Sequence, residues 1–82
     1  MFKLGTVINF FEKTGVCVVE LIQDIDINFK LKAMHEYKDT TDISIEFIQI
    51  GSKKTDFATK DQIVIIKFDK ALRKGTEIYK NG

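Results

Sequence analysis

One cysteine, Cys17, and one histidine, His35, are the two side chains that could form a nucleophile and its base. Cys17 lies in an apolar stretch at residues 16–19, where a cysteine behaves as a small buried hydrophobic residue. His35 lies in the polar stretch 34–37, which is typical of a solvated loop. We therefore expect neither side chain to be catalytic and predict that the chain is not an enzyme.

The sequence offers little to a metal ion or a cofactor. A structural zinc site needs about four Cys or His ligands, and the chain has one of each. The carboxylates of Asp24, Asp26, Asp39 and Asp42 could suggest acid/base chemistry or a hard cation, but turn chemistry explains the first two and no calcium loop surrounds them. The glycines are scattered singly, so no phosphate-binding loop is present. We predict no metal and no cofactor.

Basic side chains form the one pattern suited to binding. The candidate contacts are Lys70, Arg73, Lys74, Lys80, Lys53 and Lys54, with Lys60 nearby in the sequence. If the fold gathers them, they could contact phosphates, and exposed aromatic residues such as Phe10, Tyr37 or Tyr79 could stack on bases. The alternative is that lysines keep a small β protein soluble and protect its strand edges. From these residues alone we favour the alternative.

Length and charge bound the possibilities further. At 82 residues the chain is expected to be one domain, residues 1–82. Its net charge of +1 gives no global attraction to nucleic acid or to an anionic membrane. A lone cysteine favours a reducing compartment, and no stretch is long and apolar enough for a signal peptide or a membrane span. We predict a cytoplasmic protein.

The elements that must position these residues are strands, because the apolar residues recur with period two and many are β-branched or aromatic. We predict strands over 4–11, 16–22, 29–33, 42–50, 62–68 and 77–80. Gly15 is expected to end a hairpin loop with positive φ, and Asn28 to adopt a left-handed conformation. The run 63–66 suggests burial on both faces. Short strands with regular turn signals predict an all-β fold, a small closed six-stranded β-barrel.

The order of strands and turns resembles a known family. The residues that carry the likeness are 4–7 (LGTV), 10–21 (FFEKTGVCVVEL), 24–31 (DIDINFKL) and 72–80 (LRKGTEIYK). They resemble the translation-protein β-barrel, the second domain of elongation factor Tu, and more closely a family of stand-alone elongation factor-like proteins. The chain is also similar to the C-terminal domain of collagenase-like peptidases. Asn28 and Asp61 stand where the family has glycine.

The resemblance implies a binding module that is not an enzyme. No GTPase domain is present, so a true elongation factor is excluded, and no functional residue of the larger factors transfers to this chain. The first hypothesis is docking on RNA (tRNA or the ribosome) or on a translation or RNA-modification protein through loops and the C-terminal basic cluster. The alternative is a detached accessory subunit that binds a collagenase-like peptidase or an RNA-modifying enzyme without contacting RNA. A third hypothesis is an enzyme that uses Cys17 or His35. The oligomeric state stays open.

Overall fold

Nearly every segment of the chain is extended. The computed structural model describes residues 1–36 and 39–81, and in these residues the chain forms ten strands and no helix. The strands are β1 (Phe2–Phe11), β2 (Val16–Leu21), β3 (Ile25–Asp26), β4 (Leu31–Met34), β5 (Thr41–Ile43), β6 (Ile45–Ile50), β7 (Lys53–Thr55), β8 (Phe57–Ala58), β9 (Ile63–Phe68) and β10 (Glu77–Lys80). The described part therefore contains no helix that could cross a bilayer.

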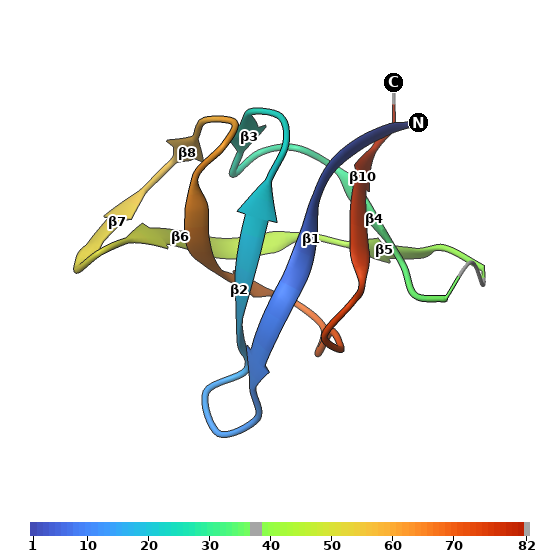
Figure 1. The fold of residues 1–82 in the computed structure, drawn as a ribbon, viewed down its shortest axis with the longest axis horizontal. Coiled ribbons are helices and arrows are strands. Elements are labelled where there is room, and N and C mark those ends of the chain that lie inside the picture. The colour runs from blue at the N-terminus through green and yellow to red at the C-terminus, as the bar shows by residue number, and fades with distance from the viewer. Residues whose placement is uncertain (37–38, 82) are drawn as a thin grey trace.

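Eight strands form one curled antiparallel sheet in the order β5-β4-β10-β1-β2-β9-β6-β7, and β3 pairs with β8 in a second, two-stranded sheet (Figure 1). In the described residues the two outer strands, β5 and β7, do not pair with each other. The sheet is therefore an open half-barrel. The predicted all-β class is confirmed, and the predicted closed six-stranded barrel is wrong.

A break at Ser44 explains part of this difference. The predicted strand over 42–50 is two strands, β5 beside β4 and β6 beside β9. The Ser44 N–H donates to Oδ1 of Asp69 at 2.9 Å, and the Asp69 N–H donates to the Ser44 carbonyl at 2.9 Å. Because both backbone groups of Ser44 are bonded to Asp69, they cannot continue a strand ladder. Residues 41–50 thus supply two strands, β5 and β6, that lie far apart in the order of the sheet.

Three short strands, β3, β7 and β8, lie in the segments between the predicted strands. Ile25 pairs with Ala58 and Asp26 with Phe57, and both Ile25 and Ala58 are buried. Strands of two or three residues are too short for an alternating pattern to stand out, which is why period-two analysis misses them.

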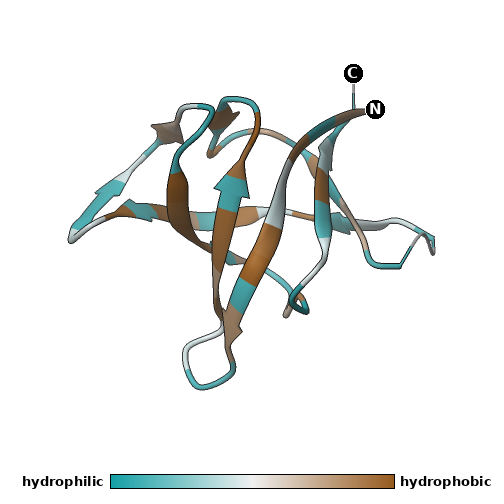
Figure 2. Ribbon diagram, viewed as in Figure 1, coloured by the Kyte–Doolittle hydropathy of each residue, from teal (hydrophilic) through white to brown (hydrophobic). Residues whose placement is uncertain are grey.

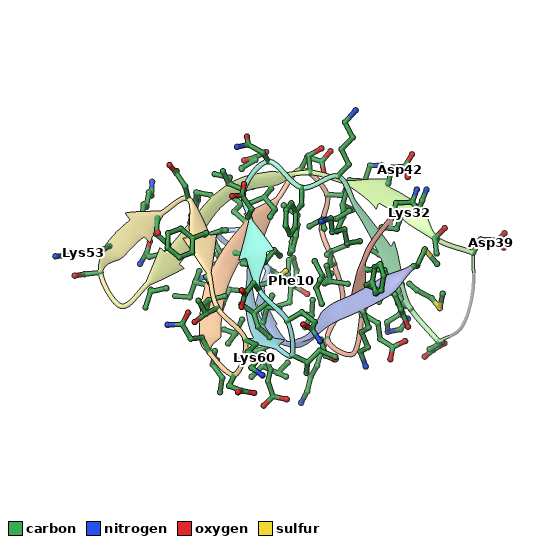
Figure 3. All side chains as sticks on the ribbon, turned by 90° about the horizontal axis from the view of Figure 1, so that it is seen from above. Phe10, Lys32, Asp39, Asp42, Lys53 and Lys60 are labelled. Carbon is green, nitrogen blue, oxygen red and sulfur yellow. The ribbon has the colours of Figure 1, made fainter. Side chains whose placement is uncertain are left out.

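The core lies against the concave side of the curled sheet. Its largest fully buried side chains are Phe68, Leu21, Ile25, Leu31, Ile48, Ile66, Ile78, Val7, Val19, Val64 and Cys17. Apolar residues run through the long central strands, whereas β7 is hydrophilic (Figure 2). Phe10, expected to be exposed, packs against the core (Figure 3). Ile63, in the run expected to be buried on both faces, is 58% exposed.

The turns follow the expectations in part. Gly15 has φ of +76°, which confirms the predicted hairpin ending. Asn28 is not among the positive-φ residues of the described part; its N–H donates to Oδ1 of Asp26 at 2.8 Å, an Asx-type turn. Asp61 instead adopts φ of +71°. Asn28 and Asp61 both replace a glycine of the resembled family, and of these two only Asp61 adopts the left-handed conformation.

Candidate functional site

The predicted basic contacts are divided among three places. Lys53 and Lys54 lie on β7 at one end of the sheet, and Figure 3 shows Lys53 at the far edge of the molecule. Lys70, Arg73 and Lys74 lie in the loop between β9 and β10 (Figure 1). Lys80 ends β10 next to the N-terminus, at the opposite end of that strand from the loop (Figure 1). The fold therefore gathers only the loop residues.

Three of these lysines have contacts within the protein. The Lys70 Nζ donates to the Asp42 carbonyl at 2.6 Å. The Lys80 Nζ lies 3.9 Å from the centre of the Phe29 ring, and the Lys54 Nζ lies 4.5 Å from that of Phe47. Such cation–π contacts stabilise the folded chain by about 0.5–1 kcal/mol at exposed sites.

The side chains of Lys53, Arg73 and Lys74 make no hydrogen bond, ion pair or ring contact with the described residues. Among the predicted contacts, these three are the cations available to a partner. Tyr37, named as a stacking residue, lies outside the described residues. The hydroxyl of Tyr79 donates to Oε2 of Glu77 at 3.1 Å.

Two of the loop residues, Lys70 and Arg73, line a small hollow of about 330 Å³ beside β4. His35, Asp39, Thr41 and the buried Thr76 are among the other lining residues. The His35 Nε2 lies 3.3 Å from the Lys74 carbonyl, so the ring ties this loop to the end of β4. The hollow has the charge to accept a carboxylate group of a partner, with Arg73 as its unpaired cation.

Cys17 has the environment of a core residue. Its side chain is fully buried and free of disulfides, and burial raises the pKa of its thiol to about 11. The thiolate is the nucleophile, so a thiol with such a pKa is unreactive near neutral pH. The predicted interpretation of Cys17 as a small buried hydrophobic residue is confirmed.

In the described part of the chain, no three His, Cys, Asp or Glu side chains gather closely enough to hold a metal ion. Asp24 and Asp26 serve loop structure, as predicted. Asp24 Oδ1 accepts the Lys60 N–H at 2.9 Å, and Asp26 accepts that of Asn28.

A larger open groove of about 940 Å³ lies where the two ends of the chain meet. The groove is lined by the apolar side chains of Phe2, Leu4 and Phe29 and by the basic side chains of Lys60 and Lys80. Its other lining residues are Met1, Lys3, Gln23, Asp24, Thr59 and Asp61. The two aspartates offset part of the charge of its three lysines. No cysteine, serine or histidine is among the lining residues, so the groove has no pair of a cysteine or serine nucleophile with a histidine base.

The convex side of the sheet is divided into two faces. On the half formed by β1, β2, β9 and β6, opposed residues place apolar side chains outward: Phe11 opposite Val16, and Val18 opposite Ile65. We call this set the apolar outer face; it comprises Phe11, Val16, Val18, Phe47, Ile63 and Ile65. It lies outside the core and is unusual for the solvated side of an antiparallel sheet.

The other half of the convex side, formed by β1, β10, β4 and β5, is charged. The Lys3 Nζ lies 2.8 Å from Oε1 of Glu77, and the Lys32 Nζ lies 2.6 Å from Oδ1 of Asp42; Figure 3 shows Lys32 beside Asp42. Hydrogen bonds from Lys32 and from Lys3 hold the pKa values of Asp42 and Glu77, respectively, below their ordinary values. This half has the polar surface expected of a sheet that faces water.

Sequence reasoning missed the apolar outer face although its signal is present. Residues 16–19 and 63–66 are apolar at both parities, and the prediction interpreted the run 63–66 as burial on both faces. The inward residues of these strands are buried, and the outward ones are partly or largely exposed. Apolar residues at both parities can therefore also mark a strand whose second face awaits a partner.

Two solved structures share this architecture. Both are of the C-terminal domain of a Geobacillus thermoleovorans protein named for the U32 peptidases. The first, a selenomethionine variant, has a TM-score of 0.85 and 20% identity and covers 98% of this chain and 100% of its own. The second has a TM-score of 0.83 and 20% identity over 96% and 91% of the two chains. The fold is that of a U32 peptidase C-terminal domain.

Sequence comparison gives a related result. The chain is 26% identical over 77 residues to an uncharacterized protease of Methanocaldococcus jannaschii. The match covers 94% of this chain and 19% of that protein, so the chain spans about a fifth of the length of its curated relative. No family model matches the chain.

These comparisons correct the first functional hypothesis. The matched proteins are named as peptidases or parts of them, and none is named as an elongation factor or an RNA-binding protein. The prediction of a translation elongation factor-like, RNA-binding protein is therefore wrong. The part of the resemblance that concerned collagenase-like peptidase C-terminal domains is the part that the comparisons support.

Proposed function

We propose that this chain is a non-catalytic accessory domain that binds a U32-type peptidase unit. The observation that carries the proposal is the structural match to the C-terminal domain of a U32 peptidase, which spans 98% of this chain and the whole of the other. The relative that is named a protease supports it from sequence, because the matching segment is a minor part of that protein. This chain then supplies contacts, and the peptidase unit supplies the chemistry.

The side chains that could do chemistry support a role without catalysis. The thiol of Cys17 is buried and has a raised pKa, and the His35 ring is bonded to a loop carbonyl. A cysteine nucleophile needs an exposed, low-pKa environment and an adjacent base. The environment of Cys17 is the opposite.

The basic residues enter this proposal as contacts to acidic groups of the partner. Among the described residues, the unpaired cations of the predicted set are Arg73 at the hollow beside β4, Lys74 next to it in the same loop, and Lys53 on β7. Arg73 can pair with a carboxylate through two parallel hydrogen bonds. Lys70, Lys80 and Lys54 already serve contacts within the fold, so we expect a smaller contribution from them. Exposed pairs of this kind contribute about 0.2–1 kcal/mol each.

The proposal is tested by calorimetric titration of the full chain into a purified U32-type peptidase unit from the same organism. We expect saturable binding, a change in the unit's peptidase activity, and no cleavage of casein by the chain alone. An Arg73→Ala/Lys74→Ala variant should bind several-fold more weakly. Absence of binding, or casein cleavage by the chain that disappears in Cys17→Ala or His35→Ala, would refute the proposal.

A further inference from the structure

The apolar outer face is exposed in this chain beyond what its fold requires. Ile63 is 58% and Phe11 46% exposed, and both stand on the convex side of the sheet, away from the core. On the other half of the same side, the equivalent positions carry Lys3, Tyr79 and Lys32 in register. The apolar half is thus a property of these residues and not of the architecture. Contiguous exposed apolar surface of this kind marks interaction sites.

Charged groups lie beside and within the apolar outer face. Glu20 lies opposite Ile63 across the β2–β9 pair, and Lys67 lies between Val16 and Phe47. The Lys67 Nζ is 3.6 Å from Oε1 of Glu46, and the Lys54 Nζ lies over the Phe47 ring. Protein–protein interfaces combine apolar side chains with polar and charged ones in this way.

The comparison with the curated relative supports one kind of partner for this face. Only 19% of that protease matches this chain, so most of its length lies outside the matching unit and can pack against it. A standard interface buries roughly 800 Å² per partner, against the 5294 Å² of accessible surface of this chain. An interface of that size corresponds to roughly 15% of this accessible surface.

We propose that the apolar outer face, centred on Ile65 and Val18, is the surface on which a U32-type peptidase unit packs. This inference rests on the proposed function and specifies where the partner binds. Ile63 and Phe11, at opposite ends of the face, act as its anchors because they are its most exposed apolar side chains. The charged residues beside and within the face fix the orientation of the partner.

The test compares variants of the full chain in calorimetric titrations with the same purified peptidase unit. Ile63→Lys and Phe11→Glu place a charge on the apolar outer face, and we expect at least a tenfold loss of affinity for each. Lys32→Ala, on the charged half, is the matched control and should bind within twofold of wild type. Circular dichroism verifies that each variant is folded. If Ile63→Lys does not fold, Ile63→Ala, which only truncates an exposed side chain, should still weaken binding about threefold or more.

The outcomes separate the two proposals. If wild type binds and Ile63→Lys or Ile63→Ala binds equally well, the docking face is wrong and the accessory function stands. If wild type does not bind at all, both are wrong. Light scattering of the chain alone tests whether the face binds a second copy of the chain instead. A wild-type dimer that Ile63→Lys converts to a monomer would assign the face to that second copy and overturn the inference.

Discussion

The Nζ of Lys70 donates a hydrogen bond to the backbone carbonyl of Asp42 at 2.6 Å. Asp42 belongs to β5, the strand at one outer edge of the eight-stranded sheet. A residue expected to contact a partner therefore occupies a backbone acceptor of an edge strand. Lysines and covering loops at sheet edges prevent unwanted strand pairing, so Lys70 protects the fold at this point.

Removing this contact should weaken the edge. We expect Lys70→Ala to lower the free energy of unfolding by less than about 1 kcal/mol, because the hydrogen bond is exposed to solvent, and to increase self-association at high concentration. Urea denaturation and size-exclusion light scattering measure the two effects. Lys74→Ala, in the same loop, is the control. Equal behaviour of the two variants would show that Lys70 does not protect β5.

The left-handed residue Asp61 should be sensitive to the shape of its side chain. At φ of +71° a β-branched residue is strained, so we expect Asp61→Val to lower the free energy of unfolding by about 1–2 kcal/mol. Asp61→Gly should be at least as stable as wild type, since glycine adopts this conformation without strain. Thermal and urea denaturation provide the comparison.

Lys60→Val is the control for Asp61, because Lys60 precedes it in the same turn without a positive φ. We expect this variant to stay within about 0.5 kcal/mol of wild type. If valine lowered the free energy of unfolding equally at Lys60 and Asp61, the role of the left-handed conformation would be contradicted.

The sequence predicts most of the sheet because the long strands bury every second residue. In β2 the inward Cys17, Val19 and Leu21 are those that alternation assigns to one face. The break at Ser44 could not be predicted, since it depends on the side chain of Asp69, which lies 25 positions further along the chain. Bonds of this kind form only after the strands are in place.

The candidate surfaces were less predictable than the fold. Lys70, Arg73 and Lys74 are close in sequence and remain close in space, whereas Lys53 and Lys80 are placed by strand pairing that no local pattern reveals. Ile63 illustrates the opposite problem: its apolar character is visible in the sequence, but whether it contacts the core or solvent depends on which side of the curled sheet it faces.

Stability should decrease in acid. Asp42 and Glu77 have folded-state pKa values below the ordinary 3.8 and 4.5, so the unfolded chain binds protons more readily than the folded one. Their contribution is fully present above the ordinary values and is lost as the pH falls through the folded values. We expect the urea midpoint to decrease as the pH is lowered below about 4.5.

The double variant Asp42→Asn/Glu77→Gln isolates this effect, because neither replacement titrates. Its urea midpoint should depend less on pH below 4.5 than that of wild type. Asp56→Asn is the control, because it removes an exposed carboxylate that forms no ion pair with the described residues. An unchanged pH profile of the double variant would mean that other groups cause the acid sensitivity.

Cys17 should be inert in the folded protein. Because its side chain is fully buried and its thiol pKa is about 11, we expect a thiol reagent at pH 8 to label the native chain far more slowly than the chain in guanidinium chloride. Mass spectrometry follows the labelling. A Thr14→Cys/Cys17→Ala variant, with its thiol in the exposed hairpin loop, should react at once. Rapid labelling of native Cys17 would contradict the buried position.

The first and last strands of the protein pair directly, with Phe2 opposite Lys80, so the chain enters and leaves at one corner of the molecule (Figure 1). A unit with adjacent ends needs a single point of attachment. It can be appended to another polypeptide, inserted into a surface loop, or rejoined end to end and reopened at the 12–15 hairpin, without a change in its strand order. Such a unit can be joined to different polypeptides while its sheet stays unchanged.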